Sequence, residues 1–171
     1  MIDLARFVRD IPDFPKAGIL FRDITPLLAS PEAFHAAVGA MADPFRQTRV
    51  DRVVGIEARG FMFGAAIARE LGLGFVPVRK PGKLPGRTER VTYGLEYGSD
   101  ALEMHADAFA PGESALVVDD VLATGGTAAA AVELIERLGA RVAGLSFFIE
   151  LGPLGGRSRL SGRPAHAVLV L

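Results

Sequence analysis

The chain has 171 residues, 50% of them hydrophobic, a length and composition that suit one compact domain with a sizeable core. Its 19 lysines and arginines nearly balance its 20 aspartates and glutamates, which argues against a basic surface for nucleic acid or a membrane. Cysteine is absent, which excludes disulfides and fits a reducing compartment. The chain shows neither a signal-peptide core nor a membrane-length apolar run. We therefore expect a soluble, cytoplasmic protein.

The first part of the chain shows little regular patterning. Residues 2–9 carry a short helical pattern, and prolines then break it. The stretch DFPKAGILFRDITP at 13–26 reads as a loop. A helix is expected from Ser30, whose hydroxyl suits a cap before Pro31, to about Arg46.

Strands and helices then alternate. VDRVVGIEARG (50–60) reads as a strand, FMFGAAIAREL (61–71) as a helix and LGFVPVRK (73–80) as a strand. Residues 81–98 have no clear period and predict a long functional loop or a loose hairpin.

The same alternation continues to the end of the chain. The remaining elements are the strands ALEMHADA (101–108) and SALVVDD (114–120), the helix GTAAAAVELIERL (126–138), and the strands RVAGLSFFIEL (141–151) and AHAVLVL (165–171). The pattern predicts one α/β domain over residues 1–171, with a mainly parallel twisted sheet flanked by helices.

Polar clusters follow three of the predicted strands. They are Glu57-Ala58-Arg59-Gly60, Arg79-Lys80 and Asp119-Asp120. Ligands of such sheets bind beyond the carboxyl ends of the strands, so we expect the three clusters to converge.

The turn Thr124-Gly125-Gly126-Thr127 lies between a strand and a helix, where free N–H groups favour a phosphate. It matches neither a Walker loop nor the dinucleotide fingerprint. An ordinary capped turn is the alternative for the tetrapeptide alone. Asp119 and Asp120 favour a sugar phosphate, because paired carboxylates accept from vicinal hydroxyls, directly or through hydrated Mg2+.

Cations gather at the end of the predicted strand 73–80 and in the loop that follows it. They are Arg79, Lys80, Lys83 and Arg87. A solvated surface is one interpretation of such a run, and recognition of a second phosphate group, together with Arg59, is the other.

The segment VVDDVLATGGT (117–127) resembles the signature of type I phosphoribosyltransferases, which bind 5-phosphoribosyl-1-pyrophosphate (PRPP). Four further stretches, DFPKAGILFRDITPLL, GIEARGFMFG, VPVRKPGKLPG and YGLEYG, resemble the adenine-specific family in the same order. The resemblance covers roughly residues 4–160. It implies the type I fold with a small N-terminal hood (about 1–30) and a flexible catalytic loop (about 80–100).

The resemblance also implies a reaction. The phosphoribosyl group of PRPP passes to adenine in purine salvage, giving AMP and pyrophosphate. The reaction depends on Mg2+, held mainly by the pyrophosphate, with Asp119 and Asp120 contributing through water. The family forms homodimers.

Site residues follow from the resemblance by position. Those expected at the 5-phosphate are Ala123, Thr124, Gly125, Gly126 and Thr127, and those at the ribose are Asp119 and Asp120. Those expected at pyrophosphate are Glu57, Ala58, Arg59 and Gly60, together with Arg79, Lys80 and Lys83, some of which are expected to come from a neighbouring subunit. Those expected at adenine are Leu20, Phe21 and Arg22. Glu96, within LEYG, and Arg59 are the expected catalytic residues.

Several alternatives stay open. Phe21 is equally well explained as core, and Glu150 and Leu151 either line the base site or serve the structure. Enzymes for 6-oxopurines carry an aspartate where this chain has Ala123, which favours adenine over hypoxanthine, guanine, xanthine or orotate. A PRPP-sensing regulator is disfavoured, because the chain shows no basic recognition helix or spare DNA-reading segment.

Overall fold

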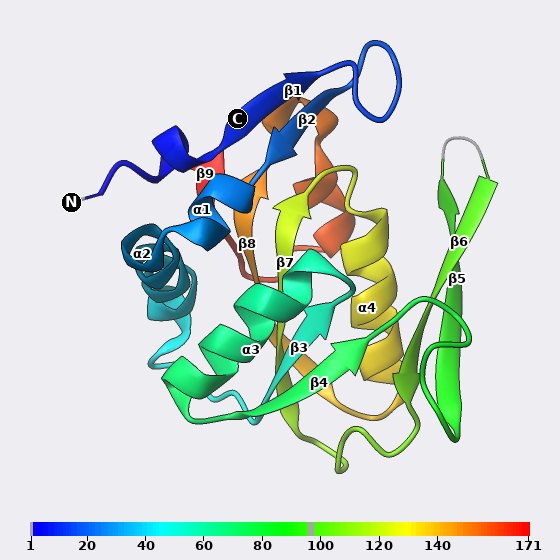
Figure 1. Cartoon of the computed structure of the whole chain (residues 1–171). Helices are drawn as coiled ribbons and strands as arrows, with labels where there is room; N and C mark the ends of the chain where they lie inside the picture. Colours follow the sequence, from blue (N-terminus) through cyan, green and yellow to red (C-terminus); the bar gives the residue numbers. More distant parts are fainter. Residues whose placement is uncertain (1, 96–97) are drawn as a thin grey trace.

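The computed structural model describes residues 2–95 and 98–171, and its centre is a parallel five-stranded sheet (Figure 1). The strands are β3 (Arg52–Ile56), β4 (Gly74–Val78), β7 (Ser114–Leu122), β8 (Arg141–Glu150) and β9 (Ala165–Val170). Their order is β4-β3-β7-β8-β9, and every neighbouring pair is parallel. The predicted α/β class with a parallel sheet is therefore confirmed.

Helices cover both faces of this sheet. Helices α2 (Pro31–Ala42) and α3 (Arg59–Leu71) lie on one face, and α4 (Gly126–Arg137) lies on the other (Figure 1). Val53 packs with the α2 and α3 side chains, whereas its neighbour Val54 packs with those of α4, because successive strand residues point to opposite faces. Within the described residues, no helix has the length and apolar character needed to cross a membrane.

Helix α2 is shorter than the pattern predicted. The Ser30 hydroxyl accepts a hydrogen bond from the Ala33 N–H at 3.3 Å, as expected of a cap. The α-helix ends at Ala42, and a 3-10 turn, η2 (Asp43–Phe45), follows. Pro44 has no N–H to continue the helical hydrogen bonding, so the extension to Arg46 was wrong.

The N-terminal region contains more regular structure than the sequence indicated. A 3-10 helix, η1 (Leu4–Phe7), precedes strand β1 (Arg9–Pro12), which pairs antiparallel with β2 (Leu20–Asp23), and α1 (Thr25–Ala29) follows. The loop predicted for 13–26 is therefore partly wrong. Arg9 stands opposite Asp23 in the register and donates to its carboxylate at 2.6 Å, a contact invisible to local patterns.

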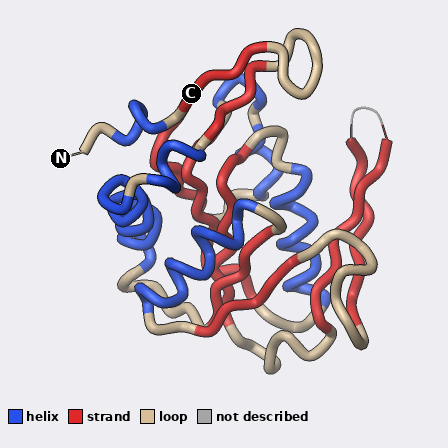
Figure 2. Tube along the Cα trace, in the orientation of Figure 1, coloured by secondary structure: helices blue, strands red, loops and turns tan. Residues whose placement is uncertain are grey.

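A second antiparallel pair replaces much of the predicted loop. Strands β5 (Thr88–Leu95) and β6 (Gly98–His105) form a hairpin beside α4 (Figure 2). Val91 and Tyr93 pack against the core cluster of α4, whereas the intervening Thr92 is exposed. The hairpin alternative is thus the correct one, and strand β6 begins and ends three residues before the predicted 101–108.

Between β8 and β9 the chain forms two 3-10 helices, η3 (Gly152–Leu154) and η4 (Gly156–Leu160). They return the chain to the strand ends of the sheet before β9 begins, as the Gly156 contacts below show. The connection between β8 and β9 is therefore an integral part of the domain.

Candidate active site

Side chains from the three strand ends meet in one cleft of about 360 Å³. Its lining residues are Ile19, Leu20, Phe21, Arg22, Glu57, Ala58, Arg59, Lys80, Asp119, Asp120, Val121, Ala123, Thr127 and Leu151. The convergence expected from parallel strand ends is thus present. The β1–β2 hairpin supplies one wall of the cleft, and the ends of β3 and β7 supply its charged floor.

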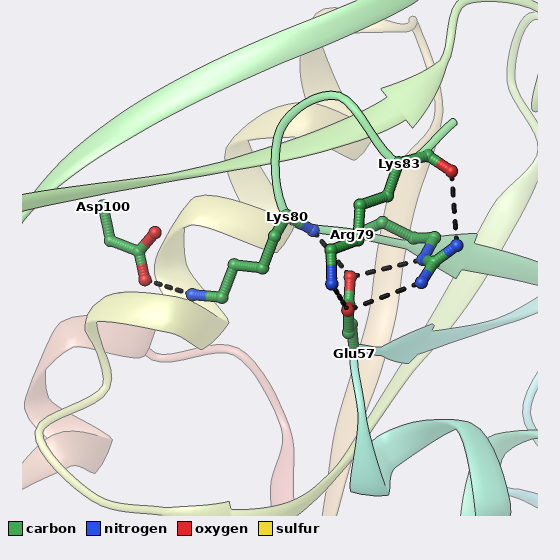
Figure 3. A network of polar contacts seen from close by, with 5 residues as sticks. All are labelled: Glu57, Arg79, Lys80, Lys83 and Asp100. Atoms are coloured by element: carbon green, nitrogen blue, oxygen red, sulfur yellow. Dashed lines mark hydrogen bonds and ion pairs between the residues drawn. The ribbon is translucent and has the colours of Figure 1, made fainter. Parts of the chain in front are cut away.

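Glu57, directly after β3, gathers the nearby cations around its carboxylate (Figure 3). It accepts from the Lys80 backbone N–H at 2.9 Å, Lys83 Nζ at 3.0 Å and Arg79 Nε at 3.2 Å. Burial alone would raise the pKa of Glu57, but these donors together outweigh it and lower the pKa to about 2. We call Arg79, Lys80 and Lys83 the cation cluster.

The turn into α3 lies tightly against the end of β7. A Cβ on Gly60 would stand 2.8 Å from Asp119 Oδ1 and 2.9 Å from the Val118 carbonyl oxygen, so glycine is needed for this approach. The close approach places the Arg59 guanidinium beside Asp120, with which it forms an ion pair. Arg59 Cζ also lies 5.6 Å from the centre of the Phe21 ring, so Arg59 links the floor of the cleft to its wall.

Asp119 and Asp120 differ in environment. The Asp120 side chain is only 7% exposed and pairs with Arg59. The Asp119 carboxylate accepts the Asp120 backbone N–H at 2.9 Å. Burial, reinforced by the charge of Asp120, raises the pKa of Asp119 well above its usual value. Hydrogen-bond donors or a cation from a ligand would favour its ionised form.

Residues 123–127, which we call the phosphate turn, border a small cavity of about 70 Å³. Gly125 has φ +81°, and Gly126 is the first residue of α4. A Cβ on Gly125 would stand 2.4 Å from the Gly156 carbonyl oxygen, and one on Gly156 would stand 2.1 Å from that of Ala123. Backbone contact with Gly156 therefore shapes the turn, while the first N–H groups of α4 stay available to an anion.

Phe21 is half-buried in the cleft wall rather than in the core. It belongs to neither hydrophobic core cluster, and the Phe14 ring meets it edge-on at 5.2 Å. One face of a flat apolar ring is thus placed beside the charged floor. The interpretation of Phe21 as core is not supported.

Some expected residues lie elsewhere. Arg79 and Lys83 reach Glu57 but do not line the main cleft. Arg87 lines a separate depression with His105 and Asp107, so it does not belong to the cation cluster. Glu96 lies outside the described residues.

Two residues near the site were missed in the sequence. The Tyr93 hydroxyl lies 3.2 Å from Thr127 Oγ1 and 3.2 Å from Asp100 Oδ2, and Asp100 pairs with Lys80. Tyr93 and Asp100 are register partners in the hairpin, so an assigned hairpin would have placed them together.

Glu150 and Leu151 have separate roles. Glu150 is buried and accepts from Arg157 Nε at 3.1 Å, which makes it structural, whereas Leu151 lines the cleft.

A parallel sheet whose strand ends carry a carboxylate pair, a phosphate turn and cations defines a sugar-phosphate enzyme of the phosphoribosyltransferase class. Residues 23–159 match the phosphoribosyl transferase domain, and the chain belongs to this family. Within this family, the chain is similar to adenine phosphoribosyltransferases. The one from Desulfitobacterium hafniense is 59% identical over 168 residues, which cover 98% of this chain and 97% of that protein.

Solved structures of adenine phosphoribosyltransferases are also similar to this chain. The adenine phosphoribosyltransferase from Rhodothermus marinus has a TM-score of 0.94 at 51% identity, covering 98% of this chain and 96% of that one. The enzyme from Saccharomyces cerevisiae, solved with an imino-altritol bisphosphate and adenine, has a TM-score of 0.92 at 43% identity, covering 98% and 97%. The predicted family is confirmed.

Proposed function

We propose that this chain transfers the 5-phosphoribosyl group of PRPP to adenine, giving AMP and pyrophosphate in purine salvage. The observation that carries the proposal is the single cleft in which the carboxylate pair, Lys80 and Phe21 surround the space beside the phosphate turn. A similar protein, the yeast adenine phosphoribosyltransferase, was solved with adenine and a bisphosphate.

The phosphate turn would hold the 5-phosphate of PRPP. Backbone N–H groups at the start of α4 carry partial positive charge, and this end of the helix borders the small cavity. Thr124 and Thr127 add hydroxyl donors, and Ala123 and the two glycines let the phosphate approach the backbone.

Asp119 and Asp120 would bind the ribose hydroxyls, because ionised carboxylates only accept hydrogen bonds. This contact fixes the ribose ring relative to the phosphate turn. Anchoring both ends of the sugar phosphate orients C1 for in-line attack, which lowers the entropic part of the barrier.

The pyrophosphate would lie against Glu57, Ala58, Arg59 and Gly60 and near the cation cluster. Breaking the bond from C1 to pyrophosphate leaves an oxocarbenium-like ribose and a highly charged leaving group. Arg59, Arg79, Lys80 and Lys83 can neutralise that charge as it develops. Arg59, already at the cleft floor, is the proposed catalytic cation.

Adenine would bind between the hairpin wall and the floor of the cleft. The Phe21 ring offers a stacking surface, and the β2 backbone near Leu20 and Arg22 offers donors and acceptors for the purine edge. Ala123 lines the same cleft without the acid of the 6-oxopurine enzymes. Glu96 remains the proposed catalytic acid, on the resemblance alone.

Mg2+ fits this site as a partner of the substrate. Among the described residues, no group of three or more His, Cys, Asp or Glu side chains is placed to bind a metal ion. Those residues therefore form no metal site made of protein side chains alone. Mg2+ typically keeps several waters and is held by one or two carboxylates with substrate phosphates. Asp119 and Asp120 would contribute through water. When bound, the ion neutralises charge on the leaving pyrophosphate.

A homodimer and a cytoplasmic location are further proposals based on family resemblance and composition. Arg79 and Lys83 contact Glu57 of their own chain, and a contribution of these cations to the site of a neighbouring subunit is part of the dimer proposal. Sedimentation of the purified protein tests the dimer.

The test of the function is a base panel. The purified protein is mixed with Mg2+, PRPP and adenine, hypoxanthine, guanine, xanthine or orotate, and pyrophosphate release is measured. We expect rapid release with adenine and little with the others. Binding of PRPP without release for any base would instead support a regulator.

A Glu96→Ala variant tests the proposed acid. Turnover should fall by about 100-fold or more while PRPP affinity stays within a few-fold. Near-normal turnover would exclude the catalytic role.

A further inference from the structure

The Lys80 ammonium group has a carboxylate partner that the proposed reaction does not use. Lys80 lines the main cleft, and its Nζ contacts Asp100 Oδ2 (Figure 3). Asp100 lies on strand β6 of the hairpin and belongs to none of the three strand-end clusters. A carboxylate beside Lys80 would repel a pyrophosphate bound there and weaken its binding. The position of Asp100 therefore needs an explanation.

Asp100 is held firmly in this position. Its Oδ1 accepts from the Ala101 N–H at 2.8 Å, and its Oδ2 accepts from the Tyr93 hydroxyl at 3.2 Å. The Tyr93 hydroxyl also lies 3.2 Å from Thr127 Oγ1 in the phosphate turn. Burial would raise the pKa of Asp100, but Lys80 and the other donors outweigh it and lower the pKa. Asp100 is therefore a fixed negative charge at neutral pH.

The other proposed pyrophosphate cations are paired in the same way. Arg59 faces Asp120, and Arg79 and Lys83 share Glu57. Positive charges gathered around one cleft repel each other, and each acid reduces that repulsion while the cleft is empty. Asp100, on the hairpin, offsets the charge of Lys80 in the same way.

We propose that Asp100 is a built-in counter-ion that holds Lys80 while the pyrophosphate region is empty and releases it when pyrophosphate binds. The inference rests on the proposed function, because it takes pyrophosphate as the ligand of Lys80. Asp100 is a positioning residue, since it acts through Lys80. It keeps pyrophosphate affinity low enough for the product to leave.

Two opposing effects decide what removing the Asp100 charge does. Lys80 loses a partner that orders it, which weakens binding. However, the two side chains are 39% and 29% exposed, and such pairs contribute little. Removal also ends the competition between Asp100 and pyrophosphate for the Lys80 ammonium group, so that the whole charge of Lys80 faces the ligand. The second effect dominates, so pyrophosphate should bind more tightly.

The experiment is calorimetric titration of the full chain with pyrophosphate in the presence of Mg2+. Asp100→Asn should lower the Kd by about five- to tenfold, and Asp100→Glu, which keeps the charge, should stay within about twofold. AMP, which has no pyrophosphate, should bind all variants equally. The matched control is Asp107→Asn, because Asp107 is an exposed acid just beyond β6 that lines a separate depression.

A Lys80→Met background tests whether Asp100 acts through the lysine. There, adding Asp100→Asn should change the Kd less than about twofold. The inference would be overturned if Asp100→Asn lowered the Kd for pyrophosphate equally with and without Lys80. It would also be overturned if Asp107→Asn lowered this Kd as much as Asp100→Asn does.

Unchanged or weaker pyrophosphate binding by a folded Asp100→Asn protein would also overturn it. Asp100→Ser provides the same test if the asparagine variant does not fold. A wild-type protein that binds no pyrophosphate would contradict the proposed function itself, so the two failures are distinguishable.

Discussion

The phosphate turn and the cation cluster are both suited to anions, yet they are built in opposite ways. The turn, residues 123–127, has no lysine or arginine and relies on backbone N–H groups held in shape by contact with Gly156. The cation cluster uses side chains that are 32% to 51% exposed and already paired with carboxylates. A rigid cradle suits the phosphate retained through the reaction, whereas exchangeable side chains suit a group that must depart.

The largest effect is expected from Gly125→Ala, which changes the phosphate turn. The new methyl group would meet the Gly156 carbonyl oxygen, and φ +81° is unfavourable for alanine. AMP affinity, measured by calorimetry, should fall on the order of 300-fold.

Gly139→Ala is the matched control for Gly125→Ala. Gly139 has φ +79° but nothing within 4 Å of its missing Cβ. This variant should lose about 1 kcal/mol of stability with AMP affinity unchanged. Normal AMP binding by a folded Gly125→Ala protein would mean that the shape of the turn is not required.

The next largest effect is expected from Arg59→Gln, at the junction of the two regions. Turnover in the pyrophosphate-release assay should fall about 100-fold, because a cation is lost where the leaving group develops charge. Asp120, with its side chain 7% exposed, would also lose its partner.

Arg69→Gln is the control for Arg59→Gln. Arg69 is an exposed cation in the last turn of the same helix, α3. Similar turnover losses in both variants would argue against a specific role for Arg59.

A smaller effect is expected from Glu57→Gln, which weakens the centre of the cation cluster. The pKa of Glu57 is lowered to about 2, so its ionised form stabilises the fold above its unfolded-state pKa of 4.5. At pH 7 the variant should lose about 2 kcal/mol. The deficit should shrink as pH falls from 4.5 toward 2, as measured by denaturant unfolding. A pH-independent deficit would contradict the charge-based explanation.

The smallest effect is expected from Ala123→Asp, which introduces a charge beside the neutral turn. The ratio of hypoxanthine to adenine turnover should rise about tenfold, because the new carboxylate can accept from a 6-oxopurine ring. No change in this ratio would show that other positions select the base.

The central sheet was predictable because its signals are local. The apolar runs ending at Ile56 and Val118, and the helical periods after Arg59 and Gly126, each follow from a few consecutive residues. Parallel topology then brought the strand-end clusters together without any further information.

The two antiparallel pairs were harder to predict because distant residues determine them. Strand β2 depends on Arg9 reaching Asp23, and β5 depends on Val91 packing against the side chains of α4. The position of Asp100 was not predicted for the same reason, since it depends on contacts with Lys80, which follows β4, and with Tyr93, across the hairpin. Arg87 was grouped with the cation cluster because it is near in sequence, although it lines another surface.

The contact between Gly156 and the phosphate turn has a consequence for how the protein is made. Gly156 leaves the ribosome only after all of α4 and β8, whereas the turn leaves before them. The most recognisable motif of the chain is therefore synthesised early but acquires its supported shape late, when η4 docks. A nascent chain that stops after β8 contains all residues of the phosphate turn but lacks Gly156, whose backbone shapes that turn.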